Sequence, residues 1–446
     1  MKYITYMSPG SANEIALVIE RRILSGGLGS GERLHSVRDL ANELGVAAGT
    51  VAAAYRQLAE TGLIIAGRGR QGTRVAPRPT AGLGSSMAGN SVPTGLVDAR
   101  HGSPDPALLP DFAAALIRAA HRTTNAYGSA LVLDELAEAV VATFETDGVP
   151  ADHLTVTNGS MDAIDRVLRA HSLRIGDRVG VEDPGHIPVH QLVRSAGLVP
   201  VPLSVDDEGI EPSAVERALS TRLAAVILTP RAQNPTGAAL TADRAADLSA
   251  VLDGHPEVLL IQDDHAGSVA GPDYVQVTPP GPRWVTIRSV GKSLSPDLRL
   301  ACLVGDGDTI GRVSAAFANG PGWVSHVLQA ATADLLTDPV AQKQVALAAT
   351  TYGRRRSRLI GALAEFEIPS SGTSGFNVWV PGVNVQAAVE AARAAGYVIA
   401  DGDPWRISSE SAVRITTNRL TNLEIDEIAA AIESTVRPQQ RRAASA

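Results

Sequence analysis

One segment without any sustained apolar period divides the chain into two unequal parts. Ala76–Leu96 reads APRPTAGLGSSMAGNSVPTGL, and this richness in Pro, Gly, Ser and Ala is typical of a linker. A chain of 446 residues is too long for one ordinary domain. We therefore expect a small domain over residues 1–76, a linker over 77–96 and a larger domain over 97–446, with a small subdomain over about 340–446.

Charge is distributed unevenly between the two parts, which we call the head and the body. The whole chain carries a net charge of -8. Residues 1–78 hold ten Lys/Arg and six Asp/Glu, a balance of +4, so the remaining 29 Lys/Arg and 41 Asp/Glu leave -12. A basic head on an acidic body predicts a DNA-binding module joined to a metabolite-binding domain, with chance asymmetry as the alternative.

The composition excludes several other classes of protein. Cys302 is the single cysteine, so the chain has no internal disulfide framework. No run of about 18 apolar residues indicates a membrane span, and the first six residues lack the apolar stretch of a signal peptide. We expect a cytoplasmic protein with no membrane partner and no metal ion.

The head has the pattern of a winged helix. We expect a first helix over 13–24, a second over 37–44 with Ser36 as its N-cap and Gly45 at its end, and a third over 46–62. Residues 63–75, LIIAGRGRQGTRV, predict two short strands around a Gly/Arg tip. The string GERLHSVRDLA at 31–41, followed by Gly45-Val46 and Thr50-Val51, resembles the GntR-type DNA-binding domain.

This resemblance implies that the start of the third helix enters the major groove. The family often carries arginines at the positions of Ala48 and Ala52, so direct base contacts are fewer in this chain. The remaining candidates for DNA binding are Arg38, Thr50, Arg56, Arg68 and Arg70. The alternatives are a solvated helix position for Arg56 and a structural role for the two arginines of the wing.

The body has the pattern of an α/β domain. Apolar runs such as Ala224–Leu228 and Val258–Ile261 alternate with amphipathic stretches such as Thr241–Leu252. This alternation predicts helices packed on a mostly parallel sheet. Ligands of such proteins bind at the carboxyl ends of the strands, so polar strings at those ends are candidates for a site.

Several polar strings occupy such positions. Asn158-Gly159-Ser160-Met161 lies between an expected strand over 154–157 and a helix that we expect to begin near Asp162, where backbone N–H groups can hold a phosphate; the same letters also occur in ordinary turns. The other strings are EDPGH at 182–186, TPRAQNPTG at 229–237, DDH at 263–265, RSVGKSLSPDLR at 288–299, SGFNVWV at 374–380 and VRI at 413–415.

The order of these strings over about residues 97–440 resembles that of fold type I aminotransferases, which bind pyridoxal 5'-phosphate (PLP). We therefore expect a winged helix-turn-helix, a large α/β domain with a mostly parallel sheet and a smaller C-terminal α+β domain. Gly291 and Asp297 depart from the family's lysine motif. His186 and His265 stand where the family usually has tyrosine.

The resemblance also implies roles for individual residues. Lys292 would form the Schiff base, Asp263 would pair with the pyridine nitrogen, Asn234 and His265 would meet the phenolic oxygen, and His186 would stack on the ring. The phosphate would be bound by Asn158, Gly159, Ser160, Met161, Ser289 and Arg299, with Tyr127 reaching it from the neighbouring subunit. Arg414 would bind a carboxylate. Asp264 is the alternative to Asp263, and ordinary loop or surface positions are the alternatives for His186 and Arg414.

A GntR-type head, a linker and an aminotransferase-like body together resemble the MocR-type transcriptional regulators. RSVGKSLSPDLRL, DDHAG and GPGWVSH resemble the PtsJ-like branch of this family, which regulates vitamin B6 salvage. The resemblance implies a homodimer that binds promoter DNA and senses either an amine or amino acid that forms an external aldimine, or PLP itself. The alternative is an active aminotransferase with a vestigial head. The effector, the operator, the sign of regulation and any transaminase turnover stay open.

Overall fold

The computed structural model describes residues 10–29, 31–60, 63–65, 72–75, 92, 94–122 and 127–443. The chain divides into two compact units, one built mainly from residues 1–91 and the other mainly from residues 92–446. These units are the head and the body. Most of the predicted linker, including residues 76–91, lies outside the described residues, as do Arg68 and Arg70.

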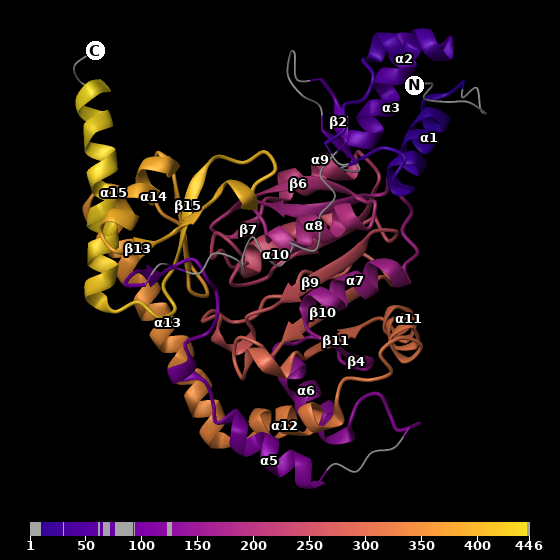
Figure 1. The fold of residues 1–446 in the computed structure, drawn as a ribbon. Helices are drawn as coiled ribbons and strands as arrows, with labels where there is room; N and C mark the ends of the chain where they lie inside the picture. Colours follow the sequence, from indigo (N-terminus) through magenta and orange to yellow (C-terminus); the bar gives the residue numbers. More distant parts are fainter. Residues whose placement is uncertain are drawn as a thin grey trace. The chain divides into compact units, whose positions relative to one another are not determined.

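The head has the predicted order of elements: α1 (Ala12–Leu24), α2 (Val37–Leu44), α3 (Ala48–Glu60), β1 (Ile64–Ile65) and β2 (Arg74–Val75) (Figure 1). The Ser36 side chain accepts a hydrogen bond from the Asp39 amide, and Gly45 ends α2 with a φ of 68°, which confirms both predicted caps. The third helix begins two residues later than predicted. β1 and β2 are antiparallel, as a wing requires.

The body is built on an eight-stranded sheet. Across the sheet the strands are β4 (Leu154–Thr157), β11 (Ala301–Gly305), β10 (Trp284–Ser289), β9 (Leu259–Asp264), β8 (Leu223–Leu228), β5 (Arg178–Asp183), β6 (Val199–Asp206) and β7 (Gly209–Ile210). β5, β8, β9 and β10 run parallel, whereas β11 is antiparallel to both of its neighbours. The mostly parallel sheet is confirmed.

Helices pack on this sheet and beside it (Figure 1). They are α5 (Phe112–Arg122), α6 (Asp134–Thr146), α7 (Ser160–Ala170), α8 (Ile187–Ser195), α9 (Pro212–Leu219), α10 (Ala242–Leu252), α11 (Gly307–Ala318) and α12 (His326–Thr337). Val226, Leu228 and Leu260 share one apolar cluster with α9 and α10. Because successive side chains of a strand point to opposite faces, Ile227 and Asp263 face the other side of the sheet.

The C-terminal part of the body is a separate small α+β layer. α13 (Pro339–Glu365) leads into an antiparallel sheet of β12 (Asn377–Pro381), β15 (Ala412–Thr416) and β14 (Ala400–Asp401), packed against α14 (Val385–Ala394) and α15 (Asn422–Ala443). Short 3-10 helices cover Pro106–Leu108, Gly267–Val269, Pro296–Leu298 and Asp403–Trp405. The smaller α+β part is confirmed.

One pairing differs from the sequence-based expectation of a contiguous C-terminal subdomain. β3 (Val97–Asp98) pairs in parallel with β13 (Tyr397–Val398), so the residues directly after the predicted linker belong with the C-terminal layer. Sequence patterns do not report this contact, because its partners lie far apart along the chain. In the described part of the chain, no helix is long and apolar enough to cross a membrane.

Candidate functional site

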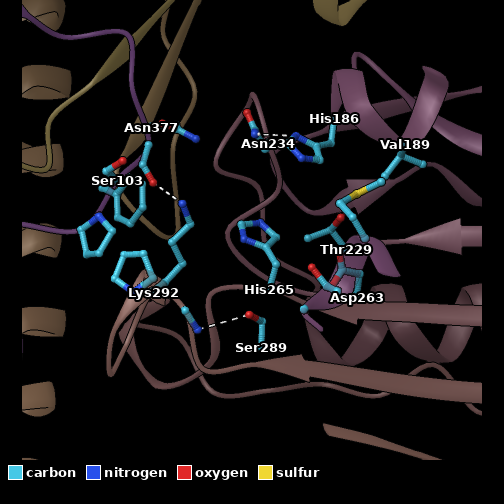
Figure 2. A pocket seen from close by; sticks show the side chains of 18 of the residues that line it. Ser103, His186, Val189, Thr229, Asn234, Asp263, His265, Ser289, Lys292 and Asn377 are labelled. Carbon is cyan, nitrogen blue, oxygen red and sulfur yellow. Dashed lines mark hydrogen bonds between the residues drawn. The ribbon is translucent and has the colours of Figure 1, made fainter. Parts of the chain in front are cut away.

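A cavity lies at the carboxyl ends of β8, β9 and β10, and Figure 2 shows side chains that line it. Most residues predicted to bind the cofactor line it: Gly159, Ser160, Met161, His186, Asn234, Asp263, His265, Ser289, Lys292 and Arg299. Strings that are spread over 140 positions of the sequence therefore converge in space. The carboxyl end of a parallel sheet is where α/β proteins bind ligands.

Lys292 lies in the turn that follows β10. Its amine donates a hydrogen bond to the Gly102 carbonyl and lies 5.7 Å from the centre of the Phe376 ring. Burial, and then the nearby charge of Arg414, lower the pKa of Lys292 to about 8. A lysine with this pKa holds an appreciable fraction of neutral amine near pH 7, which is the nucleophilic form.

The geometry separates the two neighbouring carboxylates at the end of β9. Asp264 is fully buried on the side away from the cavity, where Arg231 and Arg288 donate to it at 2.8 to 2.9 Å. Burial alone would raise the pKa of Asp264, but the two guanidinium groups outweigh burial and lower it. Asp264 is thus engaged in a structural ion-pair cluster, and Asp263 is the carboxylate that faces the cavity.

Asp263 is buried without a cation beside it. Its Oδ1 has no hydrogen-bond partner among the described residues. Burial, followed by the negative charges of Asp264 and Glu182, raises the pKa of Asp263 to about 8. A buried carboxylate costs free energy unless it is paired, so this side chain is well suited to a positively charged or N–H-bearing ligand group.

The start of α7 lies on the cavity wall and has no side-chain cap. Gly159 is the N-cap of α7 with a φ of 93°. A Cβ at Gly159 would lie 3.1 Å from the Arg299 guanidinium, so glycine keeps this position open. Free N–H groups at a helix start and an adjacent guanidinium together suit a phosphate. The helix begins two residues before the position expected from sequence.

Ser289 and Arg299 flank this helix start. Arg299 donates to the Asn158 carbonyl at 3.3 Å and adopts a left-handed backbone conformation with a φ of 44°. The Ser289 hydroxyl accepts from the Gly291 amide at 3.2 Å. Asn158 itself does not line the cavity. Its carbonyl accepts from Arg299, and its amide donates to the Asp162 carboxylate in the first turn of α7 at 3.0 Å.

A relay of hydrogen bonds joins three predicted site residues. Arg414 donates to the Asn234 Oδ1 at 2.8 Å, and the Asn234 Nδ2 lies 2.9 Å from the His186 Nδ1 (Figure 2). Arginine can only donate, which fixes the orientation of the amide and makes His186 Nδ1 the acceptor. Burial, together with His265 and the cations Lys292 and Arg414, lowers the pKa of His186 to about 3, so its ring is neutral.

Arg414 lies behind the cavity wall rather than among the lining residues. It is 1% exposed, packs over the Trp405 ring and donates to the Arg100 carbonyl, while its Nε has no partner among the described residues. Burial lowers the pKa of Arg414 to about 9, so it remains charged near pH 7. A buried guanidinium that contacts neutral acceptors alone would bind a carboxylate strongly.

Tyr127 does not reach this cavity within its own chain. Its side chain is 93% exposed, and its ring meets Trp323 edge to face at 5.5 Å between centroids. Trp323 in turn stacks on His326, with 5.9 Å between centroids. Tyr127 and Trp323 are exposed, whereas His326 is buried. A contact between Tyr127 and a phosphate would require a second chain.

The cavity also includes residues to which the sequence assigned no role. Glu182 is a buried carboxylate that accepts from the Thr229 amide, the Thr229 hydroxyl and the Gln233 amide group, and burial raises its pKa to about 7. It thereby positions the loop that carries Asn234. Gly102 and Ser103 line the cavity from the segment after β3. The string EDPGH at 182–186 contains Glu182 and is one of the predicted site strings, but no motif was found at residues 102 and 103.

The head offers a smaller set of candidates for contact with DNA. Arg38 on α2 and Arg56 on α3 are exposed and form no ion pair within the described residues, and Thr50 lies in the first turn of α3. Ala48 and Gly49 precede Thr50, so the first turn of α3 has no long side chain. Exposed arginines beside short side chains suit contacts with phosphate better than direct base readout.

The fold and the cavity define the class of protein: an aminotransferase-like body preceded by a winged helix-turn-helix. Residues 98–432 match the model of the aminotransferase class I and II family, and residues 11–75 match that of the gntR family of bacterial regulatory proteins. A kynurenine aminotransferase of Pyrococcus horikoshii superposes with a TM-score of 0.71 at 20% identity, over 78% of this chain and 92% of that one.

Two transcriptional regulators are similar to this chain, one over nearly its whole length and one over about half of it. The vitamin B6 salvage pathway transcriptional repressor PtsJ of Salmonella typhimurium is 39% identical over 95% of this chain and 97% of its own. The pyridoxine biosynthesis transcriptional regulator PdxR of Corynebacterium glutamicum is 32% identical over 55% of this chain and 54% of its own. The chain therefore belongs to the MocR-type transcriptional regulators, which confirms the family that its motifs predicted.

Proposed function

We propose that this regulator binds PLP in the cavity of its body and that the state of this cavity controls how the head binds promoter DNA. One observation carries the proposal. The Lys292 amine, the buried Asp263 carboxylate and the open N-terminus of α7 line the same cavity. An amine, an acid and an anion site are the three groups that a pyridoxal phosphate requires.

The residues fit this cofactor group by group. The phosphate would be held by the α7 N-terminus at Gly159, Ser160 and Met161, by Ser289 and Arg299, and by the Asn158 turn. Asp263 would pair with the pyridine nitrogen, Asn234 and His265 would meet the 3-hydroxyl group, and His186 would pack on the ring. When bound, PLP supplies an aldehyde that condenses with amines. Lys292 is the amine placed to meet it.

Ligand binding would release a segment of the body. The carbonyls of Arg100 and Gly102 accept hydrogen bonds from Arg414 and Lys292, and Asn418 donates to the Ser103 carbonyl. If Lys292 condensed with an aldehyde, it would lose its hydrogen bond to the Gly102 carbonyl. If Arg414 bound a carboxylate, it would lose its bond to the Arg100 carbonyl, because a charged acceptor outcompetes a carbonyl. Residues 99–103 follow β3, which itself follows the predicted linker, so their release would be the signal to the head.

The effector is an amino acid or amine, or PLP alone. Arg414 favours an amino acid, since a buried guanidinium recognises a carboxylate. Replacement of Arg414 by Lys, which cannot form two parallel bonds, should weaken the spectral response to amino acids about tenfold or more while PLP binding persists. If the response is equal in both proteins, Arg414 does not bind the effector.

A second copy of the chain would complete the site. Tyr127 and Trp323 are exposed large aromatic side chains on one surface of the body, as expected at an interface. In a homodimer of the body, the partner copy would supply the tyrosine hydroxyl to the phosphate. A regulator that binds bacterial promoter DNA would act in the cytoplasm.

The test uses the full-length protein. Lys2, Lys292 and Lys343 are the only lysines of the chain, so borohydride reduction and peptide mass mapping identify the lysine that carries PLP. We expect the adduct on Lys292, with Lys343→Ala on the exposed face of α13 as the matched control. Lys292→Ala should lose both the adduct and its absorption band, and an unchanged PLP spectrum in this variant contradicts the proposal.

Gel shifts on the DNA upstream of the chain's own coding region test the regulatory part. PLP, with and without a panel of amino acids, should change the DNA affinity of wild type and Lys343→Ala by several-fold and leave Lys292→Ala unchanged. A parallel transamination assay separates the two classes of function. Turnover without any shift of DNA would instead identify an enzyme with a vestigial head.

A further inference from the structure

His265 presents a hydrogen-bond acceptor to the cavity, where the resemblance places the 3-hydroxyl group of PLP. Its Nε2 lies 2.9 Å from the Ala232 carbonyl, and because a carbonyl only accepts, Nε2 must carry the hydrogen. Burial, and then the charge of Lys292, lower the pKa of His265 to about 4, so the ring is neutral. Nδ1 therefore carries a lone pair, and no described residue donates to it.

Asn234 presents a donor to the same region. Its Oδ1 accepts from Arg414, and one hydrogen of its Nδ2 goes to His186, as described above. The amide has a second hydrogen that remains for a ligand. In Figure 2, Asn234, His186 and His265 lie opposite Lys292. A ligand oxygen placed between Asn234 and His265 would thus meet one donor and one acceptor.

We infer that His265 selects the form of bound PLP in which the 3-hydroxyl group keeps its proton. The inference rests on the proposed function, which places PLP in this cavity. A phenol both donates and accepts, so it satisfies His265 Nδ1 and Asn234 Nδ2 together. A phenolate only accepts, and its negative oxygen would face the lone pair of His265. A tyrosine at this position would reverse the preference, because its hydroxyl can donate to a phenolate.

This selection has a chemical consequence for the link to Lys292. If PLP were joined to Lys292, a single proton would be shared between the 3-oxygen of PLP and the nitrogen of that link. If the proton stays on the oxygen, the imine nitrogen is uncharged and withdraws fewer electrons. The cavity would then hold the cofactor tightly but activate it weakly, which suits a sensor better than a catalyst.

Three variants isolate this effect. His265→Phe keeps a flat ring of similar size in the cavity but has no acceptor in the place of Nδ1. His265→Tyr places a hydroxyl donor in the cavity. His255→Gln is the control, since His255 is half-exposed, pairs with Glu257 and lies outside the cavity.

The measurement is the absorption spectrum of the PLP-loaded, full-length protein near neutral pH. The ratio of the long-wavelength band, from the protonated imine, to the short-wavelength band, from the protonated hydroxyl, reports the position of the proton. We expect both His265 variants to raise this ratio about five-fold, the equivalent of one hydrogen bond, and His255→Gln to leave it unchanged. Equal ratios in all four proteins would overturn the inference.

Two further outcomes are informative. If the His265 variants do not bind PLP, the spectrum of the wild-type protein tests the inference by itself. A dominant long-wavelength band in that spectrum would overturn it. If wild type shows neither band and no adduct on Lys292, the proposed function fails. The two failures are therefore distinguishable.

Discussion

At the scale of single residues, Asp263 should leave a mark on the pH dependence of stability. Its pKa rises from 3.8 to about 8 on folding, because burial penalises the charged form. Because the folded state holds this proton more tightly than the unfolded state, the group stabilises the fold most at pH values below the unfolded pKa. This stabilisation is lost as the pH rises toward about 8. The PLP-free body should therefore lose stability between about pH 4 and pH 8.

Asp263→Asn should flatten this dependence. We expect its unfolding free energy to exceed that of wild type by roughly 4 kcal/mol more at pH 8 than at pH 5. Urea denaturation followed by tryptophan fluorescence measures this in the body alone, because all four tryptophans, Trp284, Trp323, Trp379 and Trp405, lie there. Parallel pH profiles of the two proteins would show that Asp263 is not the titrating group.

At the scale of elements, the start of α7 should determine affinity for the phosphate. Gly159→Ala places a Cβ against Arg299 and imposes a φ of 93° on a residue that disfavours it. We expect the affinity for PLP to fall at least tenfold, since the helix N-terminus would shift. Pyridoxal, which has the aldehyde but no phosphate, is the matched ligand, and its affinity for the variant should match that for wild type. Equal losses for both ligands would indicate general damage to the cavity.

A second element-scale prediction concerns the connection between the sheet and the segment before β15. Asp183, at the end of β5, accepts hydrogen bonds from the amides of Ile407, Ser408 and Ser409 and from both serine hydroxyls. Burial would raise the pKa of Asp183, but these donors outweigh it and lower the pKa. The stabilisation is therefore present at neutral pH and lost as the pH falls through the lowered pKa.

Asp183→Asn should remove the negative charge to which these donors bond. We expect a loss of roughly 2 kcal/mol and faster hydrogen exchange at residues 405–411. Asp426→Asn is the control, because its pairing with Arg358 is solvent-exposed and should contribute less than about 1 kcal/mol. If exchange at 405–411 is unchanged, Asp183 does not hold this segment in place.

Elements and motifs were predictable here to the extent that their causes are local. Ser36 and Gly45 mark the two ends of α2, and continuous apolar runs predicted the strands that precede the site strings. Contacts between distant segments were not predictable. The pairing of β3 with β13, the bond between Gly102 and Lys292, and the place of Arg414 behind Asn234 depend on packing that no single stretch encodes. Strand alternation does separate Asp263 from Asp264, but only once α9 and α10 are known to cover the other face.

At the scale of the whole molecule, the proposal links two binding events that occur in different units of the chain. If PLP or an amino acid changes the affinity of the head for DNA by some factor, thermodynamics requires DNA to change the affinity of the body for that ligand by the same factor. This equality holds whatever the path between the units. It therefore tests the coupling itself and does not require knowledge of how the units are arranged.

We expect the factor by which ligand and DNA change each other's affinity to lie between about five-fold and 150-fold, the usual range for coupled sites. Ligand affinity would be measured from the absorption change with and without upstream DNA, and DNA affinity by gel shift with and without ligand, in the same buffer and salt. Lys292→Ala should abolish both changes together, because it removes the bond to the Gly102 carbonyl in the absence of ligand as well as the link to the ligand. A ligand that binds equally well to free and DNA-bound protein does not regulate DNA binding, however tightly it binds to the body.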